Sequence, residues 1–307
     1  MKVLVTGAQG FIGSNIVCRL IDAGHVVRAL DAEQGQLVGV EAITGDVSDP
    51  DTCQSACSGI DAIIHGAAVH HVENVVSNPL RALEVNVSGT LKMLRAAVDQ
   101  RVGKFVYLST AKIYGDPPFI PSKESDYPEP IDIYALSKFA GEHYCRLFHD
   151  SAGLDVAVIR PFSVYGPGQR LDTGYVGMLL ESLITKRPLR FPGRPDFVRD
   201  FVHVADVVRL CIQVATGSLS GMHVFNAGTG SIISLAGLVE LANKIVGVSL
   251  SAEYSQPRPK TIARSHAAMS TVADHLGFKP EISLPDGLRQ TIEWFNHPHA
   301  AGSVGKS

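Results

Sequence analysis

The sequence lacks the features that direct a chain into a membrane or out of the cell. No apolar run reaches the length of a membrane span. The first residues are typical of a strand and lack the charged and long apolar regions of a signal peptide. The five cysteines have no disulfide-framework spacing, and Cys53 and Cys57 stand four apart instead of forming a C-x-x-C motif. We therefore expect a cytoplasmic protein with reduced thiols.

Excess charge and metal-binding patterns are also missing. The net charge of −3 at pH 7 provides no general attraction to nucleic acid or to anionic membranes, so we expect neither as a partner. The twelve histidines form no H-x-x-x-H or H-E-x-x-H pattern, and the adjacent side chains of His70 and His71 would point in different directions. The sequence therefore predicts no metal site.

What the sequence does have is a glycine turn at its start, in MKVLVTGAQGFIG. Val3–Val5 predicts a short buried strand, and an amphipathic helix follows over Phe11–Ala23. Gly7 and Gly10 lie between these two elements, and Gly13 lies in the first turn of the helix. Missing side chains let backbone N–H groups at a helix start approach a pyrophosphate, so a dinucleotide site is favoured over a plain tight turn.

Strand and helix patterns alternate beyond this turn. This alternation predicts an α/β fold with a doubly wound, parallel Rossmann-type sheet. Further strands are expected at Val26–Asp31, Glu41–Gly45, Ala62–His65, Phe105–Ser109 and Val156–Arg160, and helices at Pro50–Cys57, Pro79–Gln100 and Ile133–Ala152.

The chain after Arg160 has a different composition, with many glycines and prolines. We expect residues 1–162 to form the dinucleotide-binding domain, completed by about 201–230. Residues 163–200 and 231–296 would form a smaller C-terminal α/β substrate-binding region, and 297–307 a disordered tail. Elements in this half are expected near Tyr175–Lys186, Phe201, Val204–Thr216, His223–Asn226, Leu235–Val246 and Asp286–Phe295.

Asp31 closes the second predicted strand, about twenty residues beyond the glycines. A carboxylate there can accept both ribose hydroxyls of an adenosine and would repel a 2′-phosphate, so NAD is favoured over NADP. The alternative is an ordinary turn aspartate at a strand end. Asp46 follows the third strand, where an acid can meet the adenine amino group, whereas Asp49 is typical of a helix N-cap.

Tyr134 and Lys138 stand four residues apart in a predicted helix and so share one face. An adjacent ammonium and an oxidised nicotinamide would favour the phenolate, which makes the tyrosine a candidate acid/base. An ordinary surface Tyr–Lys pair is the alternative. Ser109 and Thr110 end the fifth strand, at the edge where open α/β sheets bind ligands, and a hydroxyl there can hold the substrate oxygen.

These motifs occur together in one order along the chain. They are TGAQGFIG (6–13), Asp31, GDVSD (45–49), HGAA (65–68), NVSGT (86–90), STAKIYG (109–115), YALSK (134–138), RPFSVYGPGQ (160–169) and RDFVHVAD (199–206). The chain resembles the extended short-chain dehydrogenase/reductase family over Met1 to about Phe295. Within that family it is similar to the nucleotide-sugar epimerases and dehydratases, including UDP-glucose/UDP-galactose 4-epimerase-like proteins.

The resemblance implies a role for each matching residue. Tyr134 would be the acid/base, Lys138 would hold the nicotinamide ribose and lower the tyrosine pKa, and Thr110 would be the catalytic hydroxyl, with Ser109 able to share its work. NAD would be held by Gly7, Gly10, Phe11, Ile12 and Gly13 at the pyrophosphate, by Asp31 at the adenosine ribose, by Asp46 and Val47 at the adenine, and by Ala67 and Ala68 along the channel.

On the substrate side, the resemblance implies that Arg199 and Arg258 pair with the diphosphate of a nucleotide sugar. A solvated surface arginine is the alternative for each. Ser163 stands where the family usually has asparagine, which weakens the expected phosphate contact. Lys260-Thr261 replaces the usual Gly-Asp after the second arginine. If the alignment holds there, Ser265 falls where 4-epimerases limit sugar size, and a serine would leave room for a bulky substituent.

Ala111 and Lys112 differ from the residues usual in part of the family, and this difference restricts the reactions that we expect. Sugar 4,6-dehydratases of the family carry an Asp-Glu pair at these positions, and related decarboxylases rely on the Glu, so neither elimination nor decarboxylation is supported. We predict a nucleotide-sugar 4-epimerase that works through a 4-keto intermediate. A 4-ketoreductase of deoxysugar biosynthesis and a non-catalytic NAD-sensing regulator are the alternatives. The resemblance also implies a homodimer formed through the helices at Pro79–Gln100 and Ile133–Ala152.

Overall fold

The computed structural model describes residues 1–35, 37–70, 72–256 and 261–296, although not the side chains of 72–74. The chain divides into two compact units. Unit 1 comprises Met1–Ile113, Pro130–Arg160 and Val208–Phe225, and unit 2 comprises Tyr114–Glu129, Pro161–Val207 and the chain from Asn226 onward.

Unit 1 is built on a seven-stranded parallel sheet, as the sequence predicts. Its strand order is β11-β6-β5-β4-β1-β2-β3. The order reverses between β1 and β4, which is the switch point where sheets of this kind bind ligands. The strands are β1 (Lys2–Thr6), β2 (Val26–Asp31), β3 (Glu41–Thr44), β4 (Ala62–His65), β5 (Lys104–Leu108), β6 (Asp155–Pro161) and β11 (Met222–Ala227).

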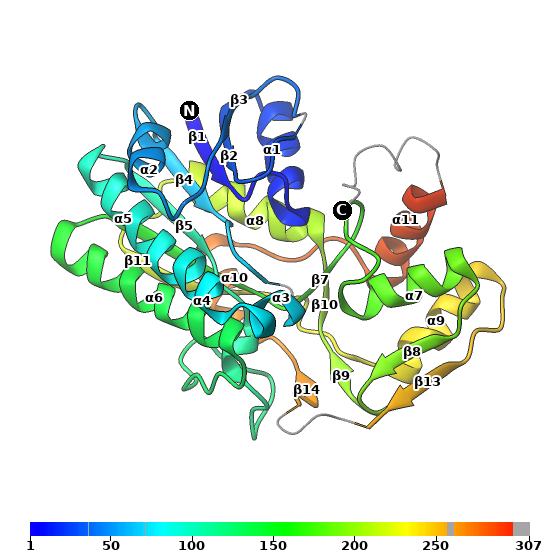
Figure 1. Ribbon diagram of the computed structural model, residues 1–307. Coiled ribbons are helices and arrows are strands. Elements are labelled where there is room, and N and C mark those ends of the chain that lie inside the picture. The colour runs from blue at the N-terminus through cyan, green and yellow to red at the C-terminus, as the bar shows by residue number, and fades with distance from the viewer. Residues whose placement is uncertain (36, 71, 257–260, 297–307) are drawn as a thin grey trace. The chain divides into compact units, whose positions relative to one another are not determined.

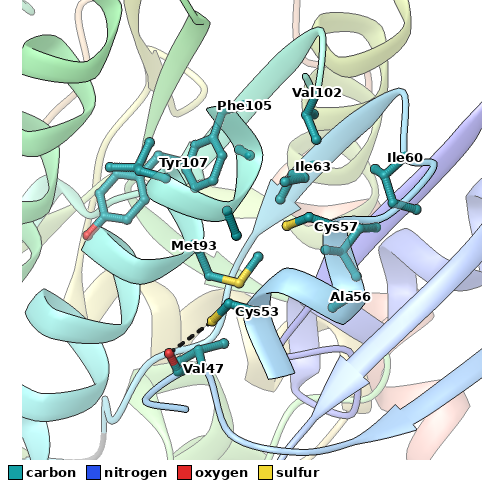
Figure 2. Packing of buried hydrophobic residues seen from close by; sticks show 14 of the residues in the cluster. Val47, Cys53, Ala56, Cys57, Ile60, Ile63, Met93, Val102, Phe105 and Tyr107 are labelled. Atoms are coloured by element: carbon teal, nitrogen blue, oxygen red, sulfur yellow. Dashed lines mark hydrogen bonds between the residues drawn. The ribbon is translucent and has the colours of Figure 1, made fainter. Parts of the chain in front are cut away.

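Helices cover both faces of this sheet (Figure 1). One face carries α1 (Phe11–Asp22) and α8 (Val204–Thr216), and the other carries α2 (Pro50–Cys57), α5 (Thr90–Asp99) and α6 (Ile133–Ala152). Figure 2 shows the core beneath α2 and α5, where Met93, Cys53 and Cys57 pack against Ile63 and Phe105 of the sheet. The buried strands are continuous apolar runs because both faces are covered.

The helical pattern predicted over Pro79–Gln100 is confirmed, but the structure divides it. It consists of α4 (Pro79–Leu83), a π-helical segment η1 (Glu84–Gly89) and α5, and a short helix α3 (Val72–Ser77) precedes it. A π turn inserts one extra residue into a helix and is frequent at functional sites. Here it contains Asn86, whose side chain is bound to the segment after β4, as described below.

Unit 2 contains small sheets, in the orders β10-β7, β12-β9-β14 and β13-β8. Its core packs α7 and α9 around Phe191, Phe197 and Phe201. The strands are β7 (Ser163–Tyr165), β8 (Leu189–Pro192), β9 (Val198–Arg199), β10 (Phe201–His203), β12 (Ile233–Ser234), β13 (Ala252–Ser255) and β14 (Arg264–Ser265). The remaining helices are η2 (Ala111–Tyr114, a 3₁₀ turn), α7 (Gly174–Thr185), α9 (Leu235–Val246), α10 (Ser270–Leu276) and α11 (Leu284–Asn296).

The sequence does not predict most of the short strands of unit 2, because strands of two to four residues are too short to show a clear periodicity. The segment Tyr114–Glu129 belongs to unit 2, whereas the sequence placed it within residues 1–162. The expected tail 297–307 lies outside the described residues. Within the described ranges no helix is both long and apolar enough to cross a membrane. No cluster of three His, Cys, Asp or Glu residues in these ranges can hold a metal ion.

Candidate functional site

The glycine turn after β1 packs directly against the turn after β4. Gly7 has a φ of 67°, and a Cβ at this residue would lie 2.8 Å from the backbone nitrogen of Ala67. A Cβ on Gly13 would lie 2.0 Å from the carbonyl oxygen of Gly7. Only glycine therefore lets α1 and the two turns approach this closely, and they meet at the switch point of the sheet.

The N-terminus of α1 is left open for an anion. Its N-cap, Gly10, provides no side-chain hydrogen bond, and the first turn contains no acidic residue. The N–H groups of Phe11, Ile12 and Gly13 begin the helix and so have no partner within it. By contrast, α6 is capped by its own Asp132, which accepts from the N–H of Ala135 at 2.7 Å. The helix start fits a pyrophosphate, as the sequence predicts.

The Asp31 carboxylate lies against the same turn. One oxygen accepts from the N–H of Gln9 at 2.8 Å and the other from the N–H of Glu33 at 3.0 Å. Each oxygen keeps a lone pair that can accept a ribose hydroxyl, whereas the negative charge disfavours a 2′-phosphate. Turn, helix start and carboxylate together suit NAD.

Asp46 and Val47 have partners of their own in this structure. The Asp46 carboxylate pairs with Arg81 and accepts from the N–H of Ser48 at 2.7 Å. Burial raises the pKa of Asp46, but Ser48 and Arg81 outweigh it, so the net pKa is below the usual value. The Val47 side chain lies in the core, and its carbonyl oxygen accepts from Cys53 Sγ at 3.2 Å (Figure 2). Their contact with adenine stays a prediction.

A buried polar relay, not foreseen from the sequence, runs beneath the turn after β4, in which Ala67 and Ala68 are half-buried. The N–H of Ala67 donates to Thr6 Oγ1 at 3.2 Å, and this hydroxyl lies 2.7 Å from His65 Nδ1. On the other side, His65 Nε2 lies 3.0 Å from Thr90 Oγ1, which donates to a backbone carbonyl. Because the Thr90 proton is used there, the ring proton is assigned to Nε2.

The His65 ring stays neutral, because burial and then the Lys138 charge lower its pKa to about 3. A neutral ring can donate on one side and accept on the other, as this relay requires. It therefore holds the turn that carries Ala67 in one position.

Asn86 extends the relay to the helix that carries Tyr134. Its amide binds both backbone groups of Val69, accepting at 2.7 Å and donating at 3.0 Å. It also donates to Ser137 Oγ at 2.9 Å, and Ser137 donates to the Tyr134 carbonyl oxygen at 2.8 Å. The asparagine of NVSGT was the only sequence signal for this link, since nothing in its spacing reveals these partners.

Tyr134 lies in the first turn of α6, and among the described residues its hydroxyl has no hydrogen-bond partner. Burial and then the charge of Asp132 raise its pKa well above the usual value. Lys112 Nζ lies 3.6 Å from Asp132 Oδ2 and 5.6 Å from the centroid of the Tyr134 ring. The phenol is therefore neutral here and can act as a base only when further positive charge approaches it.

Lys138 is 1% exposed, and its Nζ lies 4.1 Å from the centroid of the Tyr107 ring. Burial lowers the pKa of Lys138 to about 7, although Cys145 and Glu142 act in the opposite direction. The cation–π contact with Tyr107 compensates part of the lost hydration. Tyr134 and Lys138 share a helix face one turn apart, as expected from their spacing.

Of the two hydroxyls after β5, Thr110 has the proton that is still available. Thr110 Oγ1 accepts from the N–H of Lys112 at 3.2 Å and donates to no described residue. Ser109 Oγ instead donates to the buried Glu142 carboxylate at 2.5 Å. The geometry therefore favours Thr110 over Ser109 as the hydroxyl that binds a substrate oxygen, and both assignments stay predictions.

In unit 2, Arg199 is a buried cation that no described acid neutralises. Its side chain is 7% exposed and stacks on the Tyr175 ring, 5.2 Å from the centroid. Its donors reach only neutral oxygens, namely the carbonyls of Val198 (2.7 Å), Ile262 (2.7 Å) and Ala263 (3.1 Å) and the hydroxyl of Tyr175 (3.2 Å). A buried, uncompensated guanidinium is suited to an anionic ligand.

The structure places Ser265 beside Arg199, since the two residues are register partners in the β14–β9 ladder. Asp200 joins Ser163 to Ser265 through its backbone, donating to the Ser265 carbonyl at 2.9 Å and accepting from the Ser163 N–H at 3.0 Å. The buried Asp200 carboxylate, which the sequence analysis did not single out, accepts three backbone N–H groups. Arg258 lies outside the described residues.

Comparison with known proteins agrees with this geometry. The model of the NAD dependent epimerase/dehydratase family matches residues 3–228. A UDP-glucose 4-epimerase of Mycolicibacterium smegmatis is 34% identical over 97% of the chain and 99% of its own length. A dTDP-glucose 4,6-dehydratase of Streptomyces griseus is also 34% identical, over 97% of the chain and 94% of its own. Among solved structures, MoeE5 in complex with UDP-glucose and NAD has a TM-score of 0.90 at 32% identity, covering 96% of this chain and 98% of that one.

Because the Lys138 ammonium is buried, we predict that removing it increases the free energy of unfolding by an amount that depends on pH. Its pKa is about 7 in the folded state, below the ordinary 10.5, so the unfolded chain binds more protons between these values and wild-type stability rises with pH there. Lys138→Met should be more stable than wild type at about pH 7, and the difference should shrink toward about pH 10. Thermal unfolding across this range measures it. The exposed Lys244→Met is the control, and a difference that does not vary with pH would contradict the prediction.

Proposed function

The chain belongs to the NAD-dependent epimerase/dehydratase family, and we propose that within it the protein is a nucleotide-sugar 4-epimerase acting through a 4-keto intermediate. It is an NAD-dependent enzyme of the extended short-chain dehydrogenase/reductase type. When bound, NAD would supply the acceptor for the hydride of the sugar C4 and the donor that returns it, so that no external reductant would be consumed. The residues below would bind and orient the two ligands and move one proton.

The observation that carries the proposal is the arrangement of Tyr134, Lys138 and Thr110 at the carboxyl edge of the sheet. Tyr134 has an uncommitted hydroxyl and would take the proton of the 4-hydroxyl. Lys138 has its ammonium in a dry setting, where a positive charge favours the phenolate most. Thr110 has a free hydroxyl proton and would hold the same substrate oxygen.

The positions next to this trio support epimerisation over dehydration. Ala111 has no acidic group to protonate a leaving hydroxyl, and Lys112 is paired with Asp132. The 4,6-dehydratases of the family carry an acid and a base at these positions in addition to the tyrosine, as described for the sequence resemblance. Although dehydratases are among the relatives, hydride transfer at one carbon is the chemistry for which this chain has the groups.

For the substrate, we propose a nucleotide-diphosphate sugar whose diphosphate binds Arg199. The uncompensated charge of this guanidinium supports the assignment, as does the UDP-glucose in the MoeE5 complex. Ser265, beside Arg199 in the β14–β9 ladder, would border the sugar, where its small side chain leaves room for a bulky substituent. Ser163 would offer one hydroxyl to the substrate phosphate.

The decisive experiment is turnover of UDP- or dTDP-hexoses by the purified protein without added cofactor. Epimerisation at C4 should proceed with retained NAD, and Tyr134→Phe should lower the rate by about 10²- to 10⁴-fold while NAD still binds. Product analysis by NMR together with NAD titration measures both. A strict requirement for NADH would favour a ketoreductase, NAD binding without turnover would favour a regulator, and near-wild-type rates in Tyr134→Phe would refute the catalytic assignment.

Arg199→Met should raise the KM for the nucleotide sugar by about ten- to a hundredfold, because charge-assisted hydrogen bonds to the diphosphate are lost. The kcat should change less, since the arginine does not act on C4. Arg190→Met, which removes an exposed arginine paired with Glu253, is the matched control. Arg199→Lys keeps the charge and should lie between the two. Equal effects on KM from Arg190→Met and Arg199→Met would argue against a diphosphate site.

We also propose that the protein is a homodimer through α4 and α6. Leu80 and Leu83 on α4 and Leu136 and Leu147 on α6 are more than half exposed. Leu136 and Leu147 lie eleven residues, or about three turns, apart and so share one face. Leu136→Asp/Leu147→Asp should sediment as a monomer, and Val38→Asp at an isolated exposed site should not. A wild-type protein that sediments as a monomer would overturn this proposal.

A further inference from the structure

A buried ion pair lies on the same face of α6 as Tyr134 and Lys138. Glu142 and Arg160 are both 6% exposed, and they form two contacts, from Nε at 3.1 Å and from a terminal nitrogen at 2.7 Å. Ser109 Oγ donates to the same carboxylate at 2.5 Å. All these groups belong to unit 1.

We propose that Glu142 is a positioning residue for Lys138, whose carboxylate, held by Arg160 and Ser109, supplies the counter-charge that keeps the lysine ammonium charged and in place on the Tyr107 ring. This inference rests on the proposed function, in which Lys138 assists Tyr134. It concerns a residue with no contact to the reacting atoms.

Helix geometry places the Glu142 carboxylate and the Lys138 ammonium on the same side of α6. Tyr134, Lys138 and Glu142 follow one another at intervals of four, so they line one face in that order. The bidentate contact with Arg160 orients the carboxylate, and the Ser109 hydroxyl uses one further lone pair. The Arg160–Glu142 pair therefore forms a dipole. Its negative end is the Glu142 carboxylate, which α6 carries one turn after Lys138.

The balance of charge around Lys138 depends on this carboxylate. Burial disfavours the ammonium, and Glu142 is the one described carboxylate that raises the lysine pKa. Neutral groups complete the surroundings. They are Tyr134 on α6, Tyr107 on β5 and the His65 ring on β4. The Cys145 thiol on α6 is neutral as well, because burial raises its own pKa, and it also raises the lysine pKa. The Arg160 cation on β6 faces the other side of Glu142.

The described side chains on the helices packed against α6 do not replace this charge. On α4, η1 and α5, the described charged groups have other partners. Arg81 pairs with Asp46 and Glu84, Lys92 donates to the Ser48 carbonyl, and Arg95 pairs with Asp99. Among the described residues, loss of the Glu142 charge would therefore leave the ammonium without a nearby anion.

The arrangement also assigns different tasks to the two hydroxyls after β5. Ser109 is committed to the carboxylate, so it joins the end of β5 to α6. Thr110, the next residue, donates to no described residue and keeps its proton. The contacts of Ser109 and Arg160 with Glu142 thus fix the position of β5, which carries Thr110, relative to α6, which carries Lys138.

The experiment is a titration of Lys138 by NMR of lysine labelled with ¹³C at Cε, with the Lys138 signal assigned by its absence in Lys138→Met. In Glu142→Gln the midpoint should fall by about one pH unit or more, since removal of a nearby opposite charge disfavours the charged form. Glu142→Asp keeps the charge and should stay near the wild-type midpoint. Asp150→Asn removes a charge from the exposed end of the same helix and should have no effect.

Glu142→Gln also removes the carboxylate that Arg160 contacts and can destabilise the fold. The double variant Glu142→Gln/Arg160→Met removes both charges. We expect it to regain stability in thermal unfolding and still to show the lowered Lys138 midpoint, with a matching shift of the alkaline limb of kcat. A wild-type midpoint in the double variant would show that the pair has only a packing role and would overturn the proposal. The titration needs no substrate, so it can fail or succeed independently of epimerase activity.

Discussion

A positive charge held where water is scarce is the interaction on which the site depends. Lys138 is almost completely buried, with its ammonium on the Tyr107 ring and the Glu142 carboxylate one turn away. The charge is costly in that setting, and for the same reason it acts strongly on a neighbouring phenol. Stability and chemistry are therefore opposed at this residue, as is common where binding sites are built from buried charge.

The second constraint is the close contact between the two turns at the switch point. The glycine turn cannot approach Ala67 unless the segment after β4 stays where it is, and a relay of neutral groups holds it there. His65 connects that segment to the sheet, and Asn86 connects it to α6. Through Ser137 the same relay reaches the backbone of Tyr134. The turn after β4 and Tyr134, the proposed acid/base, are consequently parts of one hydrogen-bonded framework within unit 1.

The sequence predicted well wherever a residue acts through local spacing. The strands of the large sheet, the bounds of α2, α6, α8 and α9 and the shared face of Tyr134 and Lys138 are all confirmed. The sequence did not predict contacts between residues that lie far apart in the chain. Ser109 and Thr110 look equivalent in the sequence, and only Glu142, 33 residues from Ser109, separates their roles. The sequence likewise gives no sign that Asp46 pairs with Arg81 on α4, 35 residues away.

The sequence by itself determined the class of fold, the NAD cofactor and the family, because these depend on glycine turns, strand ends and one helix repeat whose geometry is local. Tertiary structure alone decided which groups are charged, paired or free. Burial and neighbours from other strands make His65 neutral and Glu142 a buried anion, and they leave Arg199 a buried cation with no acidic partner in the described part of the chain. Desolvation depends on everything that surrounds a group, and that information is absent from its position in the chain.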